Sequence, residues 1–255
     1  MTPRRSEQGP PWLVLPTYDE AGNIAPIVAA ILEKLPASAR VLIVDDNSPD
    51  GTGEIADRLA GEDERVEVLH RPRKEGLGAA YIAGFRRALA GGAGLILEMD
   101  ADFSHEPAYL PRLLESAERA DLTIGSRYVA GGGIGDWGVL RRAISRGGSA
   151  YARLVLGVGV HDLTGGFKCF RREVLEAIDL DSVRSRGYAF QVELTYRAIQ
   201  RGFSVAEVPI VFRDRRVGAS KMDRSIVLEA IWRVPLLRLG HRDETRGSPE
   251  RRDRP

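Results

Sequence analysis

The stretch "LILEMDADFSHEP", residues 95–107, decides the fold. Its apolar start has strand length, and the run ends on two carboxylates, Asp100 and Asp102, with Ala101 between them. An uninterrupted apolar run of this kind is typical of a strand buried on both faces, as in parallel sheets. Side chains two residues apart in an extended chain point the same way, so both aspartates are expected to face one cleft.

Strand and helix patterns alternate along the rest of the chain. Apolar runs of strand length occur at 12–16, 41–45, 65–70, 121–125 and 204–210. Segments with helical spacing occur at 24–35, 53–60, 78–90, 107–118, 139–156, 172–178 and 188–201. This alternation predicts an α/β domain with a mostly parallel sheet and helices on both faces. Ligands in such sheets bind outside the carboxyl ends of the strands, which is where the two aspartates lie.

Composition excludes several classes of protein. The chain has 255 residues, of which 43% are hydrophobic, so it can build a substantial core. A net charge of +1 argues against a general nucleic-acid binder. The single cysteine, Cys169, rules out an intrachain disulfide and fits a reducing cytoplasm. No secretory signal and no apolar run of about 20 residues is visible, so we expect a cytoplasmic protein.

Paired carboxylates at a strand end suit a hard divalent cation such as Mg²⁺ or Mn²⁺. The alternative is that Asp102 or Ser104 simply caps the helix expected near residue 107. Two more polar clusters, "PTYDEAGN" (16–23) and "VDDNSPDGT" (44–52), follow other strands, although the second could be only an Asx turn. Three clusters at one sheet edge favour a ligand site. A dinucleotide-dependent oxidoreductase is disfavoured, because no glycine fingerprint follows the first strand.

Six further motifs carry a family resemblance. They are "GLGAAYIAGF" (76–85), "DADFSHEP" (100–107), "GSRYVAGGGIGDW" (125–137), "DLTGGFKCFRREVL" (162–175), "GYAFQVELTYRA" (187–198) and "GASKM" (218–222). With these motifs in this order, the chain resembles the family-2 glycosyltransferases, and among them the polyprenyl- or dolichyl-phosphate mannose synthases. The resemblance covers roughly residues 12–222. The resemblance implies a nucleotide-sugar-binding fold of the GT-A type. It also implies inverting, metal-dependent transfer of mannose from GDP-mannose to a polyprenyl phosphate.

The resemblance assigns roles to individual residues. Nucleotide-sugar binding falls on Pro16, Tyr18, Glu20, Val44, Asp46, Asp100, Ala101 and Asp102. Metal binding falls on Asp100, Asp102 and Ser104, the last a hydroxyl where close relatives often have an amide, which leaves the third ligand open. The catalytic set is Asp102, Arg127, Arg141, Arg215 and Lys221, whose cations would handle phosphate. For each cation the alternative is a solvated surface charge, and either arginine of each adjacent pair could face the site.

The chemistry of the acceptor makes a general base unnecessary. A lipid phosphate is already an anion near pH 7, because its second pKa is roughly 6. It needs to be aimed rather than deprotonated. We therefore expect Glu193 to position a sugar or an arginine, and Asp162 to order the acceptor loop.

Four segments divide the chain: a disordered arm (1–11), the glycosyltransferase domain (12–224), an amphipathic helix (225–240) and a disordered charged tail (241–255). The helix has three possible uses: lying on the membrane, packing on its own domain, or docking onto a separate membrane protein. We expect the protein at the cytoplasmic face of the membrane. Two other functions remain open, a transferase that uses a UDP-sugar such as UDP-glucose and a non-catalytic nucleotide-sugar sensor.

Overall fold

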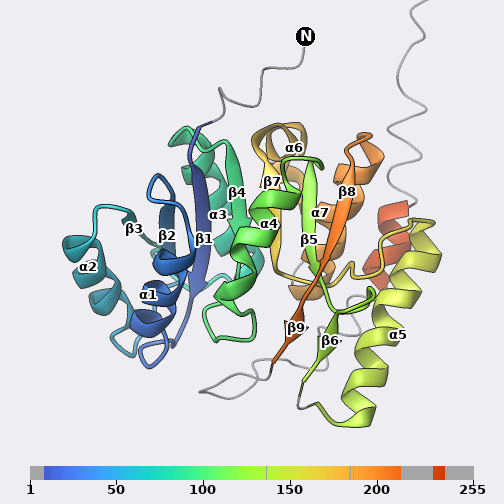
Figure 1. Ribbon diagram of the computed structural model, residues 1–255, viewed down its shortest axis with the longest axis horizontal. Helices are drawn as coiled ribbons and strands as arrows, with labels where there is room; N and C mark the ends of the chain where they lie inside the picture. The colour runs from blue at the N-terminus through green and yellow to red at the C-terminus, as the bar shows by residue number, and fades with distance from the viewer. Residues whose placement is uncertain (1–8, 136, 184, 186, 214–231, 239–255) are drawn as a thin grey trace, which may run out of the picture.

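The computed structural model describes residues 9–135, 137–183, 185, 187–213 and 232–238 (Figure 1). Arg215, Lys221 and most of the segment 225–240 lie outside these residues. Within them, the core is a seven-stranded sheet with the strand order β3-β2-β1-β4-β7-β5-β8, and a two-stranded sheet pairs β6 with β9.

The strands are β1 (Pro11–Thr17), β2 (Arg40–Asp45), β3 (Val66–His70), β4 (Leu95–Glu98), β5 (Leu122–Ser126), β6 (Gly133–Ile134), β7 (Lys168–Arg171), β8 (Val205–Pro209) and β9 (Val211–Phe212). The α-helices are α1 (Ile24–Lys34), α2 (Thr52–Glu62), α3 (Leu77–Ala90), α4 (Leu110–Ser116), α5 (Val139–Leu156), α6 (Arg172–Ala177) and α7 (Gly187–Gln200). Two 3₁₀ turns, η2 (Pro107–Tyr109) and η3 (Leu180–Ser182), complete the order.

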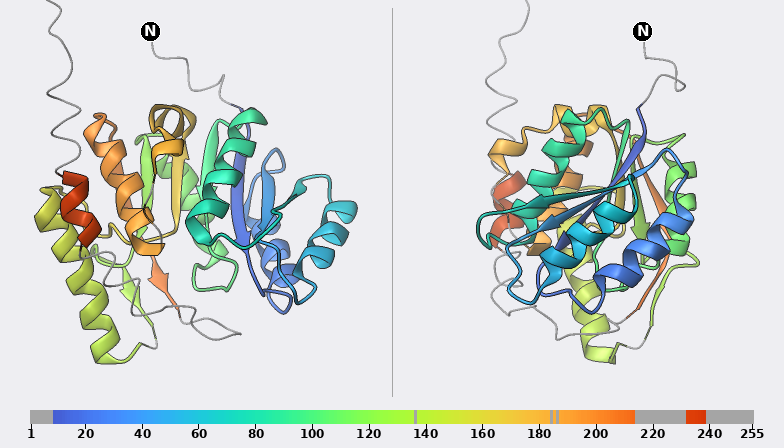
Figure 2. Two further views of the ribbon diagram at one scale, coloured as in Figure 1. Left: turned by 180° about the vertical axis from the view of Figure 1, so that it is seen from behind. Right: turned by 90° about the vertical axis from the view of Figure 1, so that its left-hand side faces the viewer.

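Helices cover both faces of the sheet (Figures 1 and 2). One apolar cluster joins the sheet to α3, α5, α6 and α7, and includes Phe85, Phe170 and Phe190. The other joins it to α1, α2 and α4, and includes Ile27, Ala56 and Leu113. The strands between the two layers are therefore buried on both sides, which explains their continuous apolar sequences.

The predicted α/β class is confirmed, and each predicted strand matches β1, β2, β3, β4, β5 or β8 to within a few residues at its ends. The sequence did not predict β7, which runs antiparallel between β4 and β5. Its four residues, "KCFR", begin and end on charged side chains, yet all four are buried. A strand this short, carrying buried charges, has no apolar period by which it could be recognised.

A short helix at residues 232–238 packs its Val234 into the core beside α5. One of the three uses considered for the segment 225–240, packing on its own domain, is therefore observed for this part of it. No helix in the described part of the chain is long and apolar enough to cross a membrane.

Candidate active site

A cavity opens at the carboxyl end of β4. Its lining comes from the segment after β4, the segment after β5, α5, the loop before β7, α7 and β9. The lining residues are Asp100, Asp102, Ser104, His105, Arg127, Trp137, Arg141, Thr164, Gly166, Tyr188 and Phe212. The cavity therefore brings together all three predicted metal ligands and two of the predicted phosphate-binding arginines.

The chain turns sharply at the two aspartates. Asp102 is buried, and its Oδ1 accepts a hydrogen bond from the backbone N–H of Ser104 at 3.0 Å. Phe103, between them, has a φ of 62°, a left-handed conformation that is uncommon outside glycine. Asp100 is one-third exposed, and the Tyr81 hydroxyl lies 3.3 Å from its Oδ1. The turn keeps both carboxylates close to the carboxyl end of β4.

The capping alternative does not hold for these residues. The helical turn that follows begins at Pro107 with Glu106 in the N-cap position, and no side chain makes a capping hydrogen bond there. Asp102 and Ser104 are instead part of the cavity lining.

The donor set fits a hard divalent cation. The buried Ser104 Oγ has no hydrogen-bond partner among the described residues, although it lines the cavity beside the two aspartates. A buried hydroxyl without a partner is costly, and a cation would supply one. The described residues hold no cluster of three or more His, Cys, Asp or Glu side chains suited to a metal. A cation here would use two carboxylates and a hydroxyl, and substrate oxygens would complete its shell, as is usual for Mg²⁺.

His105 supports the turn from inside. Its Nδ1 accepts a hydrogen bond from the backbone N–H of Asp100 at 3.3 Å, and its ring stacks on Phe167 with 5.1 Å between centroids. Burial lowers the pKa of His105 to about 4, so the imidazole is neutral near pH 7.

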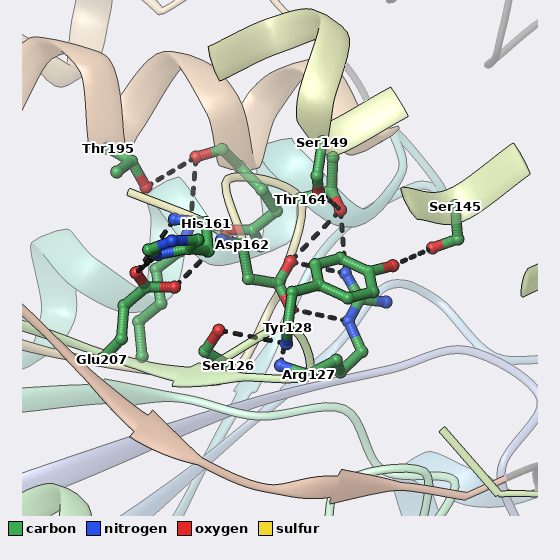
Figure 3. A network of polar contacts seen from close by, with 12 residues as sticks. Ser126, Arg127, Tyr128, Ser145, Ser149, His161, Asp162, Thr164, Thr195 and Glu207 are labelled. Atoms are coloured by element: carbon green, nitrogen blue, oxygen red, sulfur yellow. Dashed lines mark hydrogen bonds and ion pairs between the residues drawn. The ribbon is translucent and has the colours of Figure 1, made fainter. Parts of the chain in front are cut away.

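Arg127 is held by a buried carboxylate (Figure 3). Its Nε and Nη2 donate to the two oxygens of Asp162, each at 2.7 Å, and Nη2 also reaches Thr164 Oγ1 at 2.8 Å. Burial alone would raise the pKa of Asp162, but the Arg127 guanidinium outweighs it and lowers that pKa. Arg127 is thus an oriented, charge-matched group at the cavity wall rather than a solvated surface cation.

The loop that carries Asp162 is fixed from β8. Glu207 accepts hydrogen bonds from the backbone N–H groups of His161 at 2.9 Å and Asp162 at 3.0 Å (Figure 3). On the other side, Thr164 Oγ1 lies 3.1 Å from Ser149 Oγ of α5. The loop between α5 and β7 is therefore tied to β5, β8 and α5, which agrees with the ordering role expected for Asp162.

The two adjacent arginines in the first turn of α5 make different contacts. The Arg141 guanidinium lies 3.9 Å from the centroid of the Trp137 ring and lines the cavity. Arg142 Nη2 donates to the Trp137 carbonyl at 3.0 Å instead. Arg141 is therefore the member of the pair that faces the site.

Asp100 and Asp102, which are also predicted to bind the nucleotide sugar, line this cavity, whereas the predicted residues of the β1 and β2 ends lie outside it. Pro16 of β1 pairs with Val44 of β2, and both are buried. Asp46 accepts hydrogen bonds from the backbone N–H groups of Gly76 at 2.8 Å and Glu75 at 3.1 Å, and forms an ion pair with Arg71. Asp46 thus organises the segment 71–76.

Tyr18 and Glu20, which are also predicted to bind the nucleotide, contact other side chains of the protein. Lys74 Nζ lies 3.5 Å from the centroid of the Tyr18 ring, and Glu20 accepts a hydrogen bond from Asn23 at 2.7 Å. Ala101 is buried between the two aspartates. The Asx-turn alternative holds for Asp50, whose Oδ1 accepts a hydrogen bond from the backbone N–H of Thr52 at 3.1 Å.

Several residues of the site were not predicted. Trp137 and Thr164 lie in motifs that carried the resemblance, but nothing in the local pattern says that they face a cavity. Beneath the site, Lys168 of β7 lies 3.4 Å from Glu98 of β4, and both side chains are completely buried. Lys168 also donates to the Gln191 carbonyl of α7 at 3.0 Å. This pair could be found only once β7 was known to lie beside β4.

Comparison with known proteins settles the family. The profile described as "Glycosyl transferase family 2" matches residues 12–179, well over half of the chain. The chain belongs to glycosyl transferase family 2.

Two relatives within this family are similar over most of their length. A protein of Mycolicibacterium smegmatis named polyprenol monophosphomannose synthase is 51% identical over 224 residues, which cover 87% of this chain and 84% of the relative. A Micrococcus luteus protein named undecaprenyl-phosphate mannosyltransferase is 49% identical over 221 residues, covering 87% and 90%.

Solved structures support the fold. Glucosyl-3-phosphoglycerate synthase of Mycobacterium tuberculosis, in complex with Mn²⁺, uridine diphosphate and glucosyl-3-phosphoglycerate, aligns with a TM-score of 0.64 at 19% identity. The alignment covers 89% of this chain and 80% of that one. At this identity the likeness establishes the shared GT-A architecture and not the substrate.

Proposed function

We propose that this glycosyltransferase moves mannose from GDP-mannose to a polyprenyl monophosphate, with inversion at the anomeric carbon. The names of the two relatives that are about half identical support this acceptor and this sugar. The observation that carries the proposal is the cavity itself, which is lined by Asp100 and Asp102 together with Arg127 and Arg141. The acids suit a cation with a diphosphate, and the arginines suit a second phosphate.

The acceptor supplies its own nucleophile. A phosphate monoester is largely dianionic at pH 7, so one of its oxygens can attack the anomeric carbon while the bond to the diphosphate of GDP breaks. Glu193 is not placed to act as a base, because it forms an ion pair with Arg197 at 2.6 Å and accepts the Ser185 N–H at 3.1 Å. Arg127 and Arg141 would bind and orient the acceptor phosphate, as forked donors do well.

Asp100, Asp102 and Ser104 would hold the divalent cation, Mg²⁺ or Mn²⁺. When bound, such an ion offsets the negative charge that develops on the diphosphate leaving group. Asp102 keeps its orientation through the Ser104 N–H, and neutral His105 adds no competing positive charge beside it.

The nucleotide would lie over the carboxyl ends of β1 and β2. Tyr18 and Asp46 are the candidates there for contact with the guanosine, and Asp46 also orders the segment 71–76 beside it. The alternative donor is a UDP-sugar such as UDP-glucose. The enzyme would work at the cytoplasmic face of the membrane, where it meets its lipid acceptor.

A transfer assay tests the proposal. GDP-mannose, GDP-glucose and UDP-glucose, each carrying a labelled sugar, are incubated with a polyprenyl phosphate and Mg²⁺ or Mn²⁺. We expect label in the organic phase from GDP-mannose, and a loss of about 10³-fold in rate for Asp102→Ala, in line with a metal's usual contribution of several kcal/mol. If only UDP-glucose gives a labelled lipid, UDP-glucose replaces GDP-mannose as the proposed donor. No lipid product from any of the three sugars would reject the proposal.

A further inference from the structure

Tyr81 of α3 is a polar side chain inside the apolar core. It is completely buried, and its ring stacks on Phe85 of the same helix, with 5.7 Å between centroids, and on Phe190 of α7, with 6.1 Å. Helices α3 and α7 lie side by side on one face of the sheet (Figure 2). Rings packed in this way have a defined orientation, so the position of the Tyr81 hydroxyl is fixed from within the core.

Close packing of the two helices keeps Phe190 against Tyr81. This packing depends on Gly78, about one turn before Tyr81 on α3, because a Cβ atom there would lie 3.2 Å from Cδ2 of the Phe190 ring. A larger residue at this position would press on that ring. The sequence of α3 therefore supplies both the space that Phe190 occupies and the tyrosine ring that Phe190 supports.

The Tyr81 hydroxyl reaches the edge of the candidate active site. It donates a hydrogen bond to Asp100 Oδ1 at 3.3 Å. Among the residues that the structure describes, the cavity lining includes Asp100 but not Tyr81. The hydroxyl therefore influences the cavity through the carboxylate of Asp100 rather than by touching a ligand itself.

Both carboxylates of the candidate metal site are thus oriented by neutral donors. Asp102 accepts a hydrogen bond from the Ser104 N–H, and Asp100 accepts one from Tyr81, while His105 acts on the backbone of Asp100. A neutral donor leaves the negative charge of a carboxylate intact. The two oxygens have about four lone-pair sites, so they can accept the tyrosine hydrogen bond and still bind a cation. An arginine or lysine in the place of Tyr81 would instead compete with the cation.

We propose that Tyr81 is a positioning residue, whose hydroxyl holds the Asp100 carboxylate in place for a divalent cation. The inference rests on the proposed function, because Asp100 needs a fixed orientation only if it binds the cation. The motif that contains Tyr81, residues 76–85, contributes to the family resemblance, but the resemblance assigns none of its residues a role. Groups that hydrogen-bond to metal ligands typically contribute about ten- to a hundredfold to metal affinity, and the length of the Tyr81–Asp100 contact places it at the low end.

Mn²⁺ binding to the full chain carrying Tyr81→Phe tests the inference, because this change removes the hydroxyl and keeps the ring. Free Mn²⁺ is measured by electron paramagnetic resonance in the presence of GDP, and a protein-free titration corrects for Mn²⁺ bound to GDP alone. We expect the dissociation constant for Mn²⁺ to rise about tenfold. Transfer should be slowed at limiting Mn²⁺ and should largely recover at saturating Mn²⁺, with the KM for polyprenyl phosphate unchanged. A purely structural role of Tyr81 would instead lower the unfolding temperature in EDTA and leave the Mn²⁺ affinity unchanged.

Two comparisons separate the possible outcomes. The control, Tyr196→Phe, removes a hydroxyl from another residue of the same apolar cluster and should change the Mn²⁺ affinity by no more than about twofold. In an Asp100→Asn background, Tyr81→Phe should cause no further loss of affinity, because the two residues act as one unit.

Each result either supports or overturns the role of Tyr81. An Mn²⁺ affinity of Tyr81→Phe equal to that of the wild type, or an undiminished loss in the Asp100→Asn background, would overturn the inference. A wild type that binds neither Mn²⁺ nor Mg²⁺ with GDP would overturn it together with the proposed cation site. Mannose transfer by the wild type is measured alongside. Its absence counts against the proposed function, whereas intact transfer with an unchanged affinity of Tyr81→Phe counts only against the role of Tyr81.

Discussion

The two halves of the sheet satisfy their buried carboxylates in different ways. In the half built from β3, β2, β1 and β4, Asp102 accepts a hydrogen bond from a backbone N–H group, and Asp46 combines such bonds with an ion pair to Arg71. In the half built from β7, β5 and β8, Asp162 is held by the guanidinium of Arg127. Glu193 is held similarly by Arg197.

The kind of partner decides how far the charge of a carboxylate is balanced. A backbone N–H orients a carboxylate without cancelling its charge, which suits Asp102 to a cation. A side-chain cation cancels that charge, so Asp162 and Glu193 in the second half are locally balanced. Lys168 and Glu98 form such a pair at the seam between the halves. We expect substitutions to affect mainly ligand binding in the first half and mainly stability in the second.

The largest effect is expected at Asp162. Asp162→Ala leaves Arg127 buried and unpaired, and an arginine cannot escape by losing its proton. Breaking a buried pair in this way typically lowers the free energy of unfolding by about 3–5 kcal/mol. Urea denaturation should show this loss with little dependence on pH between neutral and mildly acidic conditions.

A surface pair serves as the matched control. Glu176 pairs with Arg172 at 2.6 Å, but both side chains are at least one-third exposed. Glu176→Gln should change stability by less than about 1 kcal/mol. If Asp162→Ala were equally mild, the contrast between the two halves would be lost.

Lys168→Met should lower the free energy of unfolding by about 3 kcal/mol at neutral pH. This is less than the loss expected for Asp162→Ala, although the Lys168–Glu98 pair is also fully buried. Burial already raises the pKa of Glu98, so the abandoned carboxyl can take up a proton. The penalty should therefore shrink as pH falls, and urea midpoints at several pH values would reveal this. Glu98→Leu combined with Lys168→Met should be close to the wild type or more stable. A double variant as unstable as the single would contradict this account.

How much could be predicted from sequence also differs between the halves. The first half follows from local periodicity, because each strand is followed by its own helix and each acid cluster comes directly after a strand. The Arg127–Asp162 pair joins positions 35 residues apart, and the Glu98–Lys168 pair depends on β7, which has no apolar period. Lys168 and Arg171 look like surface charges until their neighbours are known. The family motifs still identified Arg127 and Arg141, but not the partners that orient them.

A smaller effect is expected at Asp46. Asp46→Asn removes the charge that holds Arg71 and the N–H groups of Glu75 and Gly76, and bonds to a charged group contribute about 1.5–3 kcal/mol. We expect a stability loss of about 2 kcal/mol, faster amide exchange in the segment 71–76, and weaker binding of GDP-mannose by calorimetry. Glu62→Gln, an exposed carboxylate of α2, should change stability by no more than about 0.5 kcal/mol. Unchanged exchange at Gly76 would show that Asp46 does not organise this segment.

The smallest effect concerns His70, at the carboxyl end of β3. Its Nε2 lies 2.8 Å from Asp57 Oδ1, and this hydrogen bond, more than the nearby Asp45, raises the pKa of His70 above 6.5. A raised histidine pKa gives stability that is fully present below pH 6.5 and is lost as pH rises through the folded-state pKa. Because His70 is half exposed, the loss should be below about 1 kcal/mol. Urea midpoints at mildly acid and mildly alkaline pH should therefore differ slightly more for the wild type than for His70→Gln. Asp57→Asn removes the partner of His70 and should therefore also remove most of the extra pH dependence of the wild type. An equal pH dependence of the urea midpoint in all three proteins would mean that the contact contributes nothing.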